Sequence, residues 1–399
     1  MRYPLIRPNP PKLSALHDAL TALEESGIYS NNGPILRRFE AQTRDTLFGG
    51  RGDCLGVANA TLGLMLAIRH EAHLRSKDDG IALMPSFTFA ATAQAASWAG
   101  LRPMFCDIDE ESWCPSPESE ERLLRQNRGR VAVIVPYATF GNALDLDRYM
   151  WLGRRHEVGV VIDAAASLGA RDERGLGFGA DAPFAVVYSM HATKTFATAE
   201  GGLIYSADTA LVQTLRDMAN FGFGEPRTAT LPGLNAKLGE ISALLALEKL
   251  REIDAVVAHR MVLADRYREL LTDFQLQRPL GQSQSPQFMP LLLPERLAPQ
   301  RAEIVARLGK AGVGAATYFS PHLAEQPWFR DNCSFGVLPV TQNIASRVLS
   351  LPIVDQMEVA DVDAICAILR ETCVASDIEA LASHTDTQPA LQRRAAGVR

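Results

Sequence analysis

The sequence predicts an α/β protein, with a mostly parallel central sheet in a large domain and a smaller α+β domain at the C-terminal end. Two observations carry this prediction. Between about residues 54 and 206, short apolar segments alternate with helix-like segments, which is typical of a sheet covered by helices. Most of the apolar segments are near-continuous runs of Val, Ile and Ala without alternation, as expected for strands that are buried on both faces.

The expected elements of the large domain follow in chain order. An N-terminal arm, a helix at 12–25 and, after a turn rich in Asn and Gly, a second helix at 35–46 open the chain. Leu36, Phe39 and Leu47 have the roughly helical spacing that supports the second helix. Strands are expected at 54–58, 81–84, 103–107, 131–136, 158–162, 185–189 and 202–206, with helices between them, for example at 61–73 and 92–99.

The pattern changes after about residue 208, where charged helical segments replace the strand rhythm. Helices are expected at 238–253, 256–274, 300–311, 341–349 and 360–372, and one strand is expected at 288–293. This pattern indicates a long connecting helix and a second domain. We therefore expect a large domain over 1–250, which includes the N-terminal arm, a small domain over 251–375, and a flexible, polar tail over 376–399.

The composition excludes several classes of protein. With 399 residues, of which 47% are hydrophobic and 22% charged, the chain has the mix of a globular protein and not of a disordered one. The net charge of −6 argues against extensive nucleic-acid binding, which needs a basic surface. The six cysteines form no CxxC pair and the eight histidines no HExxH pattern, so no metal is expected. Without a signal-peptide pattern or a long apolar run, we expect a cytoplasmic protein with no membrane partner.

The strongest local motif is YSMHATK at residues 188–194, which EGG at 200–202 follows. A strand ends at Ser189, and a loop of small and hydroxyl-bearing residues then presents Lys194. Ligand sites in open α/β sheets lie outside the carboxyl ends of the strands. A lysine at such a site can form a Schiff base when its amine is neutral. The alternative is an ordinary surface lysine, and Lys194 alone does not decide between the two.

A second candidate is Asp163, which ends the apolar run Val160-Val161-Ile162. A carboxylate at the end of a buried strand is costly without a cationic partner, and the neighbouring sequence supplies none. The protonated pyridine nitrogen of pyridoxal phosphate would serve, because this cofactor combines a lysine Schiff base with an Asp partner. The alternative is an Asp that caps the next helix.

Two further loops carry candidate ligand contacts. Asn59-Ala60-Thr61 lies between a strand and a helix, where free N–H groups and a hydroxyl can bind phosphate. The alternative there is a plain Asn or Thr N-cap. Pro85-Ser86-Phe87-Thr88-Phe89 follows the strand at 81–84, and an aromatic side chain there can stack on a planar ring. For either Phe alone, a place in the core is the more common role.

Together these features resemble the DegT/StrS family of nucleotide-sugar aminotransferases, which are fold-type I enzymes that use pyridoxal phosphate. The resemblance runs from about Ile6 to Leu369. Its landmarks, in order, are Asn32-Gly33-Pro34, Asn59-Ala60-Thr61, Pro85-Ser86-Phe87-Thr88-Phe89, Phe105-Cys106-Asp107-Ile108-Asp109, Asp163-Ala164-Ala165, residues 189–202, Gly233-Leu234-Asn235-Ala236-Lys237, Tyr318-Phe319-Ser320-Pro321-His322 and Leu351-Pro352.

The resemblance implies roles for individual residues in binding pyridoxal phosphate. Lys194 would hold the cofactor as a Schiff base and then move the substrate proton, while Asp163 would keep the pyridine nitrogen protonated. Phe89 would stack on the ring. The phosphate would be bound by Ala60, Thr61 and Ser189.

The resemblance also implies a homodimer with shared active sites. Asn235 would reach the phosphate that is bound in the neighbouring subunit. Three positions depart from the family pattern: Ala166 stands where Gln or His is common, Lys237 where Arg is usual, and Ala60 where Gly is common. None of these departures affects the expected chemistry.

The implied reaction transfers an amino group from an amino acid, expected to be glutamate, to a nucleotide-linked keto-deoxysugar. The Ser-x-His-Ala-Thr-Lys motif, with Asn-Asn-Gly-Pro near the start, resembles members that act at C4 of a dTDP-4-keto-6-deoxyhexose. Such reactions belong to amino-sugar biosynthesis, for lipopolysaccharide or antibiotic glycosylation. The expected substrate contacts are Asn32, His191, Tyr318 and His322.

Three alternatives accompany this interpretation. One is an aminotransferase that acts at C3 of a 3-keto sugar nucleotide. Another is a nucleotide-sugar dehydratase of the same fold, which has histidine in place of the lysine, so that Lys194 argues against it. The third is a non-catalytic regulatory protein that binds pyridoxal phosphate. It would need a fused DNA-binding module, and none is expected before residue 36.

Overall fold

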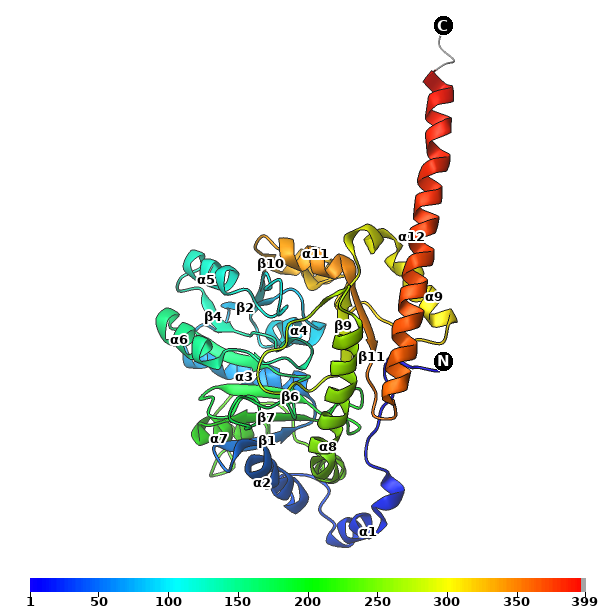
Figure 1. Cartoon of the computed structure of the whole chain (residues 1–399). Helices are drawn as coiled ribbons and strands as arrows, with labels where there is room; N and C mark the ends of the chain where they lie inside the picture. Colours follow the sequence, from blue (N-terminus) through cyan, green and yellow to red (C-terminus); the bar gives the residue numbers. More distant parts are fainter. Residues whose placement is uncertain (396–399) are drawn as a thin grey trace.

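An eight-stranded sheet forms the centre of the molecule, in a computed structural model that describes the backbone of residues 1–395 and the side chains of residues 1–378 (Figure 1). Its strand order is β1-β7-β6-β5-β4-β2-β3-β10. The strands are β1 (Asp53–Val57), β2 (Ile81–Pro85), β3 (Arg102–Cys106), β4 (Val131–Ile134), β5 (Gly159–Asp163), β6 (Ala185–Ser189), β7 (Gly202–Ser206) and β10 (Ser334–Phe335). Only β7 runs antiparallel to its two neighbours, and the other pairs are parallel. The predicted fold class is confirmed.

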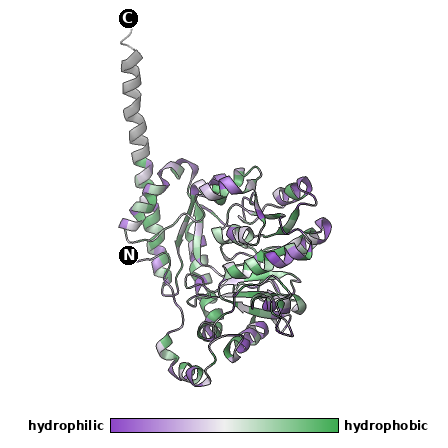
Figure 2. Ribbon diagram, turned by 180° about the vertical axis from the view of Figure 1, so that it is seen from behind, coloured by the Kyte–Doolittle hydropathy of each residue, from purple (hydrophilic) through white to green (hydrophobic). Residues whose placement is uncertain are grey.

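Helices cover both faces of this sheet and create two apolar cores. On one face lie α2 (Pro34–Phe48), α5 (Pro117–Gln126), α6 (Leu146–His156) and the first half of α8 (Glu240–Leu270). On the other face lie α3 (Ala60–Leu74), α4 (Ala90–Trp98) and α7 (Thr209–Met218). The strands are buried along most of their length, which explains why the sequence shows apolar runs and not an alternating pattern. Figure 2 shows the hydrophobic residues gathered on these strands and mixed with polar residues on the outer helices.

A second, smaller sheet has the antiparallel order β11-β9-β8, built from β8 (Gln275–Leu276), β9 (Phe288–Leu292) and β11 (Val348–Pro352). It shares a core with α9 (Arg301–Lys310) and with the start of α12 (Val359–Ala395). The expected helix at 341–349 is wrong at its end, because α11 (Pro339–Arg347) stops there and the next residues pair with β9 as β11. Pairing with β9 buries Val348, Leu349 and Leu351 in the core, and this outweighs the local helical pattern.

Helix α8 joins the two parts of the molecule as one continuous helix of 31 residues. The two segments expected at 238–253 and 256–274 therefore form a single helix. Its side chains up to Val257 pack in the core of the large sheet, and those from Leu263 onward pack in the core of the small one. The domain junction that we expected near residue 250 lies inside this helix.

Two segments cross between the parts. Tyr3, in the arm expected to belong to the large domain, is buried in the core of the small one and pairs with the backbone of Gly312 and Gly314. Conversely, β10 lies within the expected small domain, yet it pairs with β3 at the edge of the large sheet. The expected tail over 376–399 is helical as far as Ala395, because α12 continues to that residue, and 396–399 lie outside the described residues. Within residues 1–395, no helix combines the length and the apolar character needed to cross a lipid bilayer.

Candidate active site

A cavity of about 620 Å³ opens at the carboxyl ends of β5 and β6. Its walls come from the strand ends, the first turns of α3 and α4, the segment after β4, the loop between β6 and β7, the start of β9, the segment after α9, and the arm. The lining residues are Ile6, Asn59, Ala60, Thr61, Leu62, Leu64, Phe89, Ala91, Tyr137, Phe140, Asp163, Ala165, Ser189, His191, Thr193, Lys194, Glu200, Gln287, Phe288, Tyr318 and Phe319. The cavity thus lies where open α/β sheets bind their ligands.

Lys194 lies in the loop between β6 and β7, and its amine faces this cavity. The Nζ atom donates a hydrogen bond to Oε1 of Gln287 at 3.3 Å. Burial lowers the pKa of Lys194 below its usual value, and the negative charge of Asp163 opposes this shift. A lysine with a lowered pKa carries more neutral, nucleophilic amine near neutral pH, as a Schiff-base lysine requires.

Asp163 ends β5 and is buried at the base of the cavity. Its Oδ2 accepts a hydrogen bond from the Thr92 hydroxyl at 2.6 Å, and its Oδ1 accepts one from the backbone N–H of Ala165 at 3.1 Å. The Thr88 hydroxyl lies 2.9 Å from that of Thr92, and Thr88 is the donor because Thr92 gives its hydrogen to Asp163. Burial raises the pKa of Asp163, while the hydrogen bonds and Lys194 lower it.

The first turn of α3 lies on another wall and presents Ala60 and Thr61. Asn59 caps this helix, because its Oδ1 accepts the N–H of Leu62 at 2.9 Å. The first N–H groups of a helix have no partner within the helix, so this turn can bind an anion. Gly202 of β7 passes so close that a Cβ atom there would lie 2.7 Å from the backbone nitrogen of Ala60. The glycine that follows Glu200-Gly201 is therefore needed for the strand to approach the helix start.

Aromatic side chains form much of the remaining wall. Phe89 precedes α4 and is 61% exposed, although it is large and apolar, because it borders the open cavity. The rings of Phe140 and Phe319 stack with centroids 5.2 Å apart, and those of Phe288 and Tyr318 stack at 5.5 Å. Such aromatic walls can pack against a planar ligand.

The expected substrate contacts do not all meet at this cavity. His191 and Tyr318 line it, and Nδ1 of His191 lies 2.8 Å from the Thr193 hydroxyl. Asn32 is outside the lining, and so is His322, which is buried with its Nδ1 2.8 Å from the hydroxyl of Ser86.

The cofactor contacts expected on this subunit, by contrast, gather in one place. Ala60, Thr61, Phe89, Asp163, Ser189 and Lys194 all line the cavity. Asn235 lies outside it on an exposed segment. The roles of all these residues stay predictions.

Sequence reasoning missed several residues of the site. Gln287, Tyr137 and Phe140 line the cavity although no motif singles them out. Thr92 lies outside the lining and donates a hydrogen bond to Asp163. For Thr92 there was a signal, since Thr88 and Thr92 are four residues apart at the start of a helix. Gln287 comes from a distant segment, so no local pattern could have indicated it.

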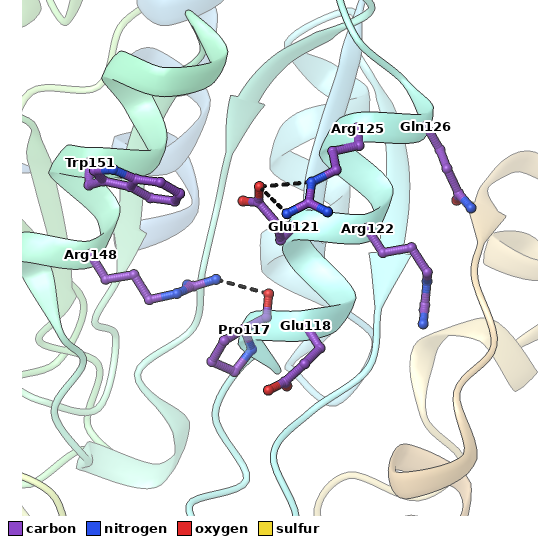
Figure 3. Close-up of a pocket in the computed structure, with 8 residues that line it drawn as sticks. All are labelled: Pro117, Glu118, Glu121, Arg122, Arg125, Gln126, Arg148 and Trp151. Carbon is purple, nitrogen blue, oxygen red and sulfur yellow. Dashed lines mark hydrogen bonds and ion pairs between the residues drawn. The ribbon is translucent and has the colours of Figure 1, made fainter.

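A second hollow of equal volume, about 620 Å³, lies on the outer surface between α5 and α6 (Figure 3). None of the predicted site residues lines it. Two of its arginines bind groups of the hollow itself: Arg125 pairs with Glu121 at 2.9 Å, and Arg148 donates to the backbone oxygen of Pro117 at 3.2 Å. Arg122 and Trp151 complete its wall.

The groups present in the cavity match what pyridoxal phosphate needs. Asp163 is a buried carboxylate that forms hydrogen bonds but, within the described part of the chain, no direct ion pair, so a bound cation would satisfy it. Lys194 supplies an amine with a lowered pKa, and the start of α3 supplies N–H groups for a phosphate. The residues of this chain therefore fit the cofactor.

Comparison with known proteins gives a consistent result. Residues 13–370 match the model of the DegT/DnrJ/EryC1/StrS aminotransferase family. Protein Rv3402c of Mycobacterium tuberculosis H37Rv is 33% identical over 93% of this chain and 90% of its own length. The dTDP-4-amino-4,6-dideoxy-D-glucose transaminase of Escherichia coli is 24% identical over 88% of this chain and 93% of its own length. The UDP-4-amino-4-deoxy-L-arabinose–oxoglutarate aminotransferase of Shewanella sediminis is 27% identical over 92% and 97%.

Solved structures agree with these relatives. A crystal structure of a protein from Bacillus cereus ATCC 10987, assigned as a PLP-dependent aminotransferase, is 36% identical, with a TM-score of 0.86 over 92% of this chain and 100% of that one. DesI, solved in the presence of its TDP-sugar product, is 29% identical, with a TM-score of 0.84 over 96% of each chain. The expectations of the fold, of the aminotransferase class and of pyridoxal phosphate as cofactor are confirmed.

Proposed function

The chain belongs to the DegT/DnrJ/EryC1/StrS aminotransferase family, and we propose that it moves an amino group from glutamate to C4 of a dTDP-4-keto-6-deoxyhexose in amino-sugar biosynthesis. One observation carries the proposal: Lys194, Asp163 and the start of α3 face a single cavity. A relative with 24% identity is a dTDP-4-amino-4,6-dideoxy-D-glucose transaminase, and DesI has a TDP-sugar product, which supports the nucleotide and the position. The oxoglutarate in the name of the Shewanella sediminis relative supports glutamate as donor.

The cofactor would be held by three walls of the cavity. When bound, pyridoxal phosphate supplies a carbonyl carbon that exchanges amines and a protonated ring that withdraws electrons. The N–H groups at the start of α3, with the hydroxyls of Thr61 and Ser189, would bind the phosphate. Asp163 would keep the proton on the ring nitrogen, because a charged partner relieves the cost of its burial. Phe89 would lie against the ring.

Lys194 does the work of proton transfer. Its Nζ atom must be neutral to accept a proton from the carbon that bears the amino group, and burial favours the neutral form by lowering the pKa of Lys194. The same Nζ would pass that proton on within the first half of the reaction, and in the second half it would deliver a proton to the sugar carbon that receives the amino group. The opposing charge of Asp163 limits how far the pKa falls, so the amine can hold a proton during each transfer.

We further propose that the active unit is a cytoplasmic homodimer. The segment 219–239 carries Asn235 at the surface, away from the cavity of its own chain. Phe221 on this segment is 47% exposed, as suits a surface that a second copy covers. In such a dimer Asn235 would contact the phosphate in the neighbouring subunit, so each cavity would be completed by the other chain.

A product screen tests the proposed substrate. The enzyme, loaded with pyridoxal phosphate, is incubated with glutamate and a panel of nucleotide-linked 3-keto and 4-keto sugars, and each amine is identified by mass and NMR. We expect amination at C4 of the dTDP-linked 4-keto-6-deoxyhexose. Amination at C3 would favour the alternative aminotransferase. Failure to aminate any sugar, by a protein that still binds the cofactor, would favour the regulatory alternative.

A further inference from the structure

Gln287 is the side chain that holds the amine of Lys194 in this structure, and no motif of the sequence assigns it a role. It directly precedes β9 and lies on the cavity wall. Its Oε1 accepts a hydrogen bond from Lys194 Nζ at 3.3 Å, and its Nε2 donates one to the backbone oxygen of Thr193 at 3.0 Å. One amide group therefore bridges the two ends of the lysine, its side-chain amine and the peptide bond that precedes it.

Chemistry fixes the orientation of this amide. The backbone oxygen of Thr193 can only accept a hydrogen bond, so it must face the NH₂ group of Gln287. The oxygen of the amide must then face Lys194 Nζ, where it can accept a hydrogen bond from either the neutral or the charged amine. The reverse orientation would place the amide oxygen of Gln287 against the Thr193 oxygen and lose that hydrogen bond.

The backbone on both sides of this contact is fixed by other groups. The Thr195 hydroxyl donates to the backbone oxygen of Pro286 at 3.0 Å. The buried Arg260 donates to the same Pro286 oxygen at 3.1 Å and pairs through Nε with Asp355 at 2.5 Å. The neighbours of Lys194 and of Gln287 are thus bound together without the Gln287 side chain. Substituting that side chain therefore leaves the framework in place.

We propose that Gln287 is a catalytic residue whose amide oxygen holds Lys194 Nζ while the amine is free and sets how readily it takes up a proton. An amide oxygen stabilises the charged amine through one hydrogen bond but adds no charge of its own. A carboxylate at 287 would raise the pKa of the lysine strongly, and an apolar side chain would leave its charged form without this acceptor. The proposal rests on the role of Lys194 in amino-group transfer and not on which sugar is the acceptor.

Two substitutions of similar size test this proposal through opposite effects. In Gln287→Glu the new negative charge should raise the pKa of Lys194 by about one to two pH units. In Gln287→Met the acceptor is lost at nearly constant volume, so the pKa should fall. Gln213→Met, on the exposed face of α7, is the matched control and should leave the pKa of Lys194 unchanged, because Gln213 lies outside the cavity lining and donates its hydrogen bond to Asp217.

The measurement is the rate at which acetic anhydride labels Lys194 in the full-length enzyme with pyridoxamine phosphate bound, the form in which this amine is free, at a series of pH values, quantified by peptide mass spectrometry. It reports the free amine directly and needs no sugar, so it is independent of the proposed substrate. Shifts of opposite sign in the two variants support the proposal. A pKa that does not move, or that moves in the same direction in both, overturns it. If Gln287→Met does not fold, as judged by thermal melting, Gln287→Glu alone decides by the sign of its shift.

Discussion

The two hollows of this molecule have the same volume but differ in how their polar groups are satisfied. Between α5 and α6, two of the lining arginines form ion pairs: Arg125 with Glu121, and Arg148 with the buried Glu120. At the ends of β5 and β6, Asp163 is buried and, within the described part of the chain, has no direct ion pair, while Lys194 donates a hydrogen bond to the neutral amide of Gln287. The ion pairs of the first hollow are complete within the protein, while the second contains charges that a ligand can complete. The two hollows therefore cannot be distinguished by volume. They can be distinguished by whether their charged side chains form ion pairs within the protein.

The largest loss of activity is expected from Lys194→Ala, which removes the amine that distinguishes the cavity at β5 and β6 from the outer hollow. Amino-group transfer should fall by at least about 10³-fold, because both the covalent link to the cofactor and the proton carrier are lost. The check is a steady-state assay with glutamate. In parallel, borohydride reduction of the wild-type enzyme and peptide mapping should label Lys194. A label on another lysine, or a variant that retains turnover, would refute its assigned role.

Asp163→Asn should have the next largest effect. The neutral amide keeps the shape of the carboxylate but cannot hold a proton on the ring nitrogen, so turnover should fall by about 10²-fold. Cofactor affinity should change far less, since the phosphate is bound by the start of α3. The two quantities are measured as kcat and as the Kd of pyridoxal phosphate. Equal losses in both would mean that Asp163 serves binding and not electron withdrawal.

Thr92→Val should shift the pH dependence more than the maximal rate. Asp163 has a pKa that burial raises and that the Thr92 hydroxyl lowers, so loss of this hydroxyl should raise the pKa further. The carboxylate would then be protonated at a higher pH, and the acid limb of kcat/KM should move upward by about one pH unit. A pH profile of the variant beside the wild type measures this. An unmoved acid limb would show that Asp163 does not control it.

The smallest effect on activity is expected from Arg148→Met in the outer hollow. Turnover should stay within about twofold, while the free energy of unfolding should fall by about 3 kcal/mol, because the fully buried Glu120 loses its charged partner. Burial already raises the pKa of Glu120, and loss of Arg148 raises it further. The folded variant then keeps Glu120 protonated while the unfolded chain ionises it, so the penalty should grow as the pH rises above about 4.3. Urea unfolding at pH 5 and at pH 8 tests the sign of this trend.

Much of the fold could be predicted because local and tertiary requirements agree. A strand such as β5 is buried on both faces, so the residues before Asp163 at its end must be apolar, and the sequence shows this apolar run. Helix α11 and strand β11 show the opposite case, since the helical pattern continues past Arg347 but pairing with β9 takes over at Val348. Local periodicity cannot contain that information, because the partner strand is more than fifty residues away.

The residues of the site also fall into those that the sequence could predict and those that it could not. Lys194 and Asp163 stand at strand ends within recognisable motifs, so the sequence indicates them directly. Gln287 is brought to Lys194 only by the packing of the small sheet against the large one, and no spacing along the chain reveals it. For His322 the motif predicts a substrate contact, and the structure places the side chain outside the cavity lining, buried against Ser86, where burial lowers its pKa.

The pairing of Tyr3 with Gly312 and Gly314 has a consequence for how the protein assembles on the ribosome. The arm leaves the ribosome about three hundred residues before the segment that receives it. Until then Ile6, three residues further along, has no fixed place at the cavity wall. Closure of that wall is therefore a late event in biosynthesis, and a nascent chain released early would carry Lys194 and Asp163 in a cavity that is still open.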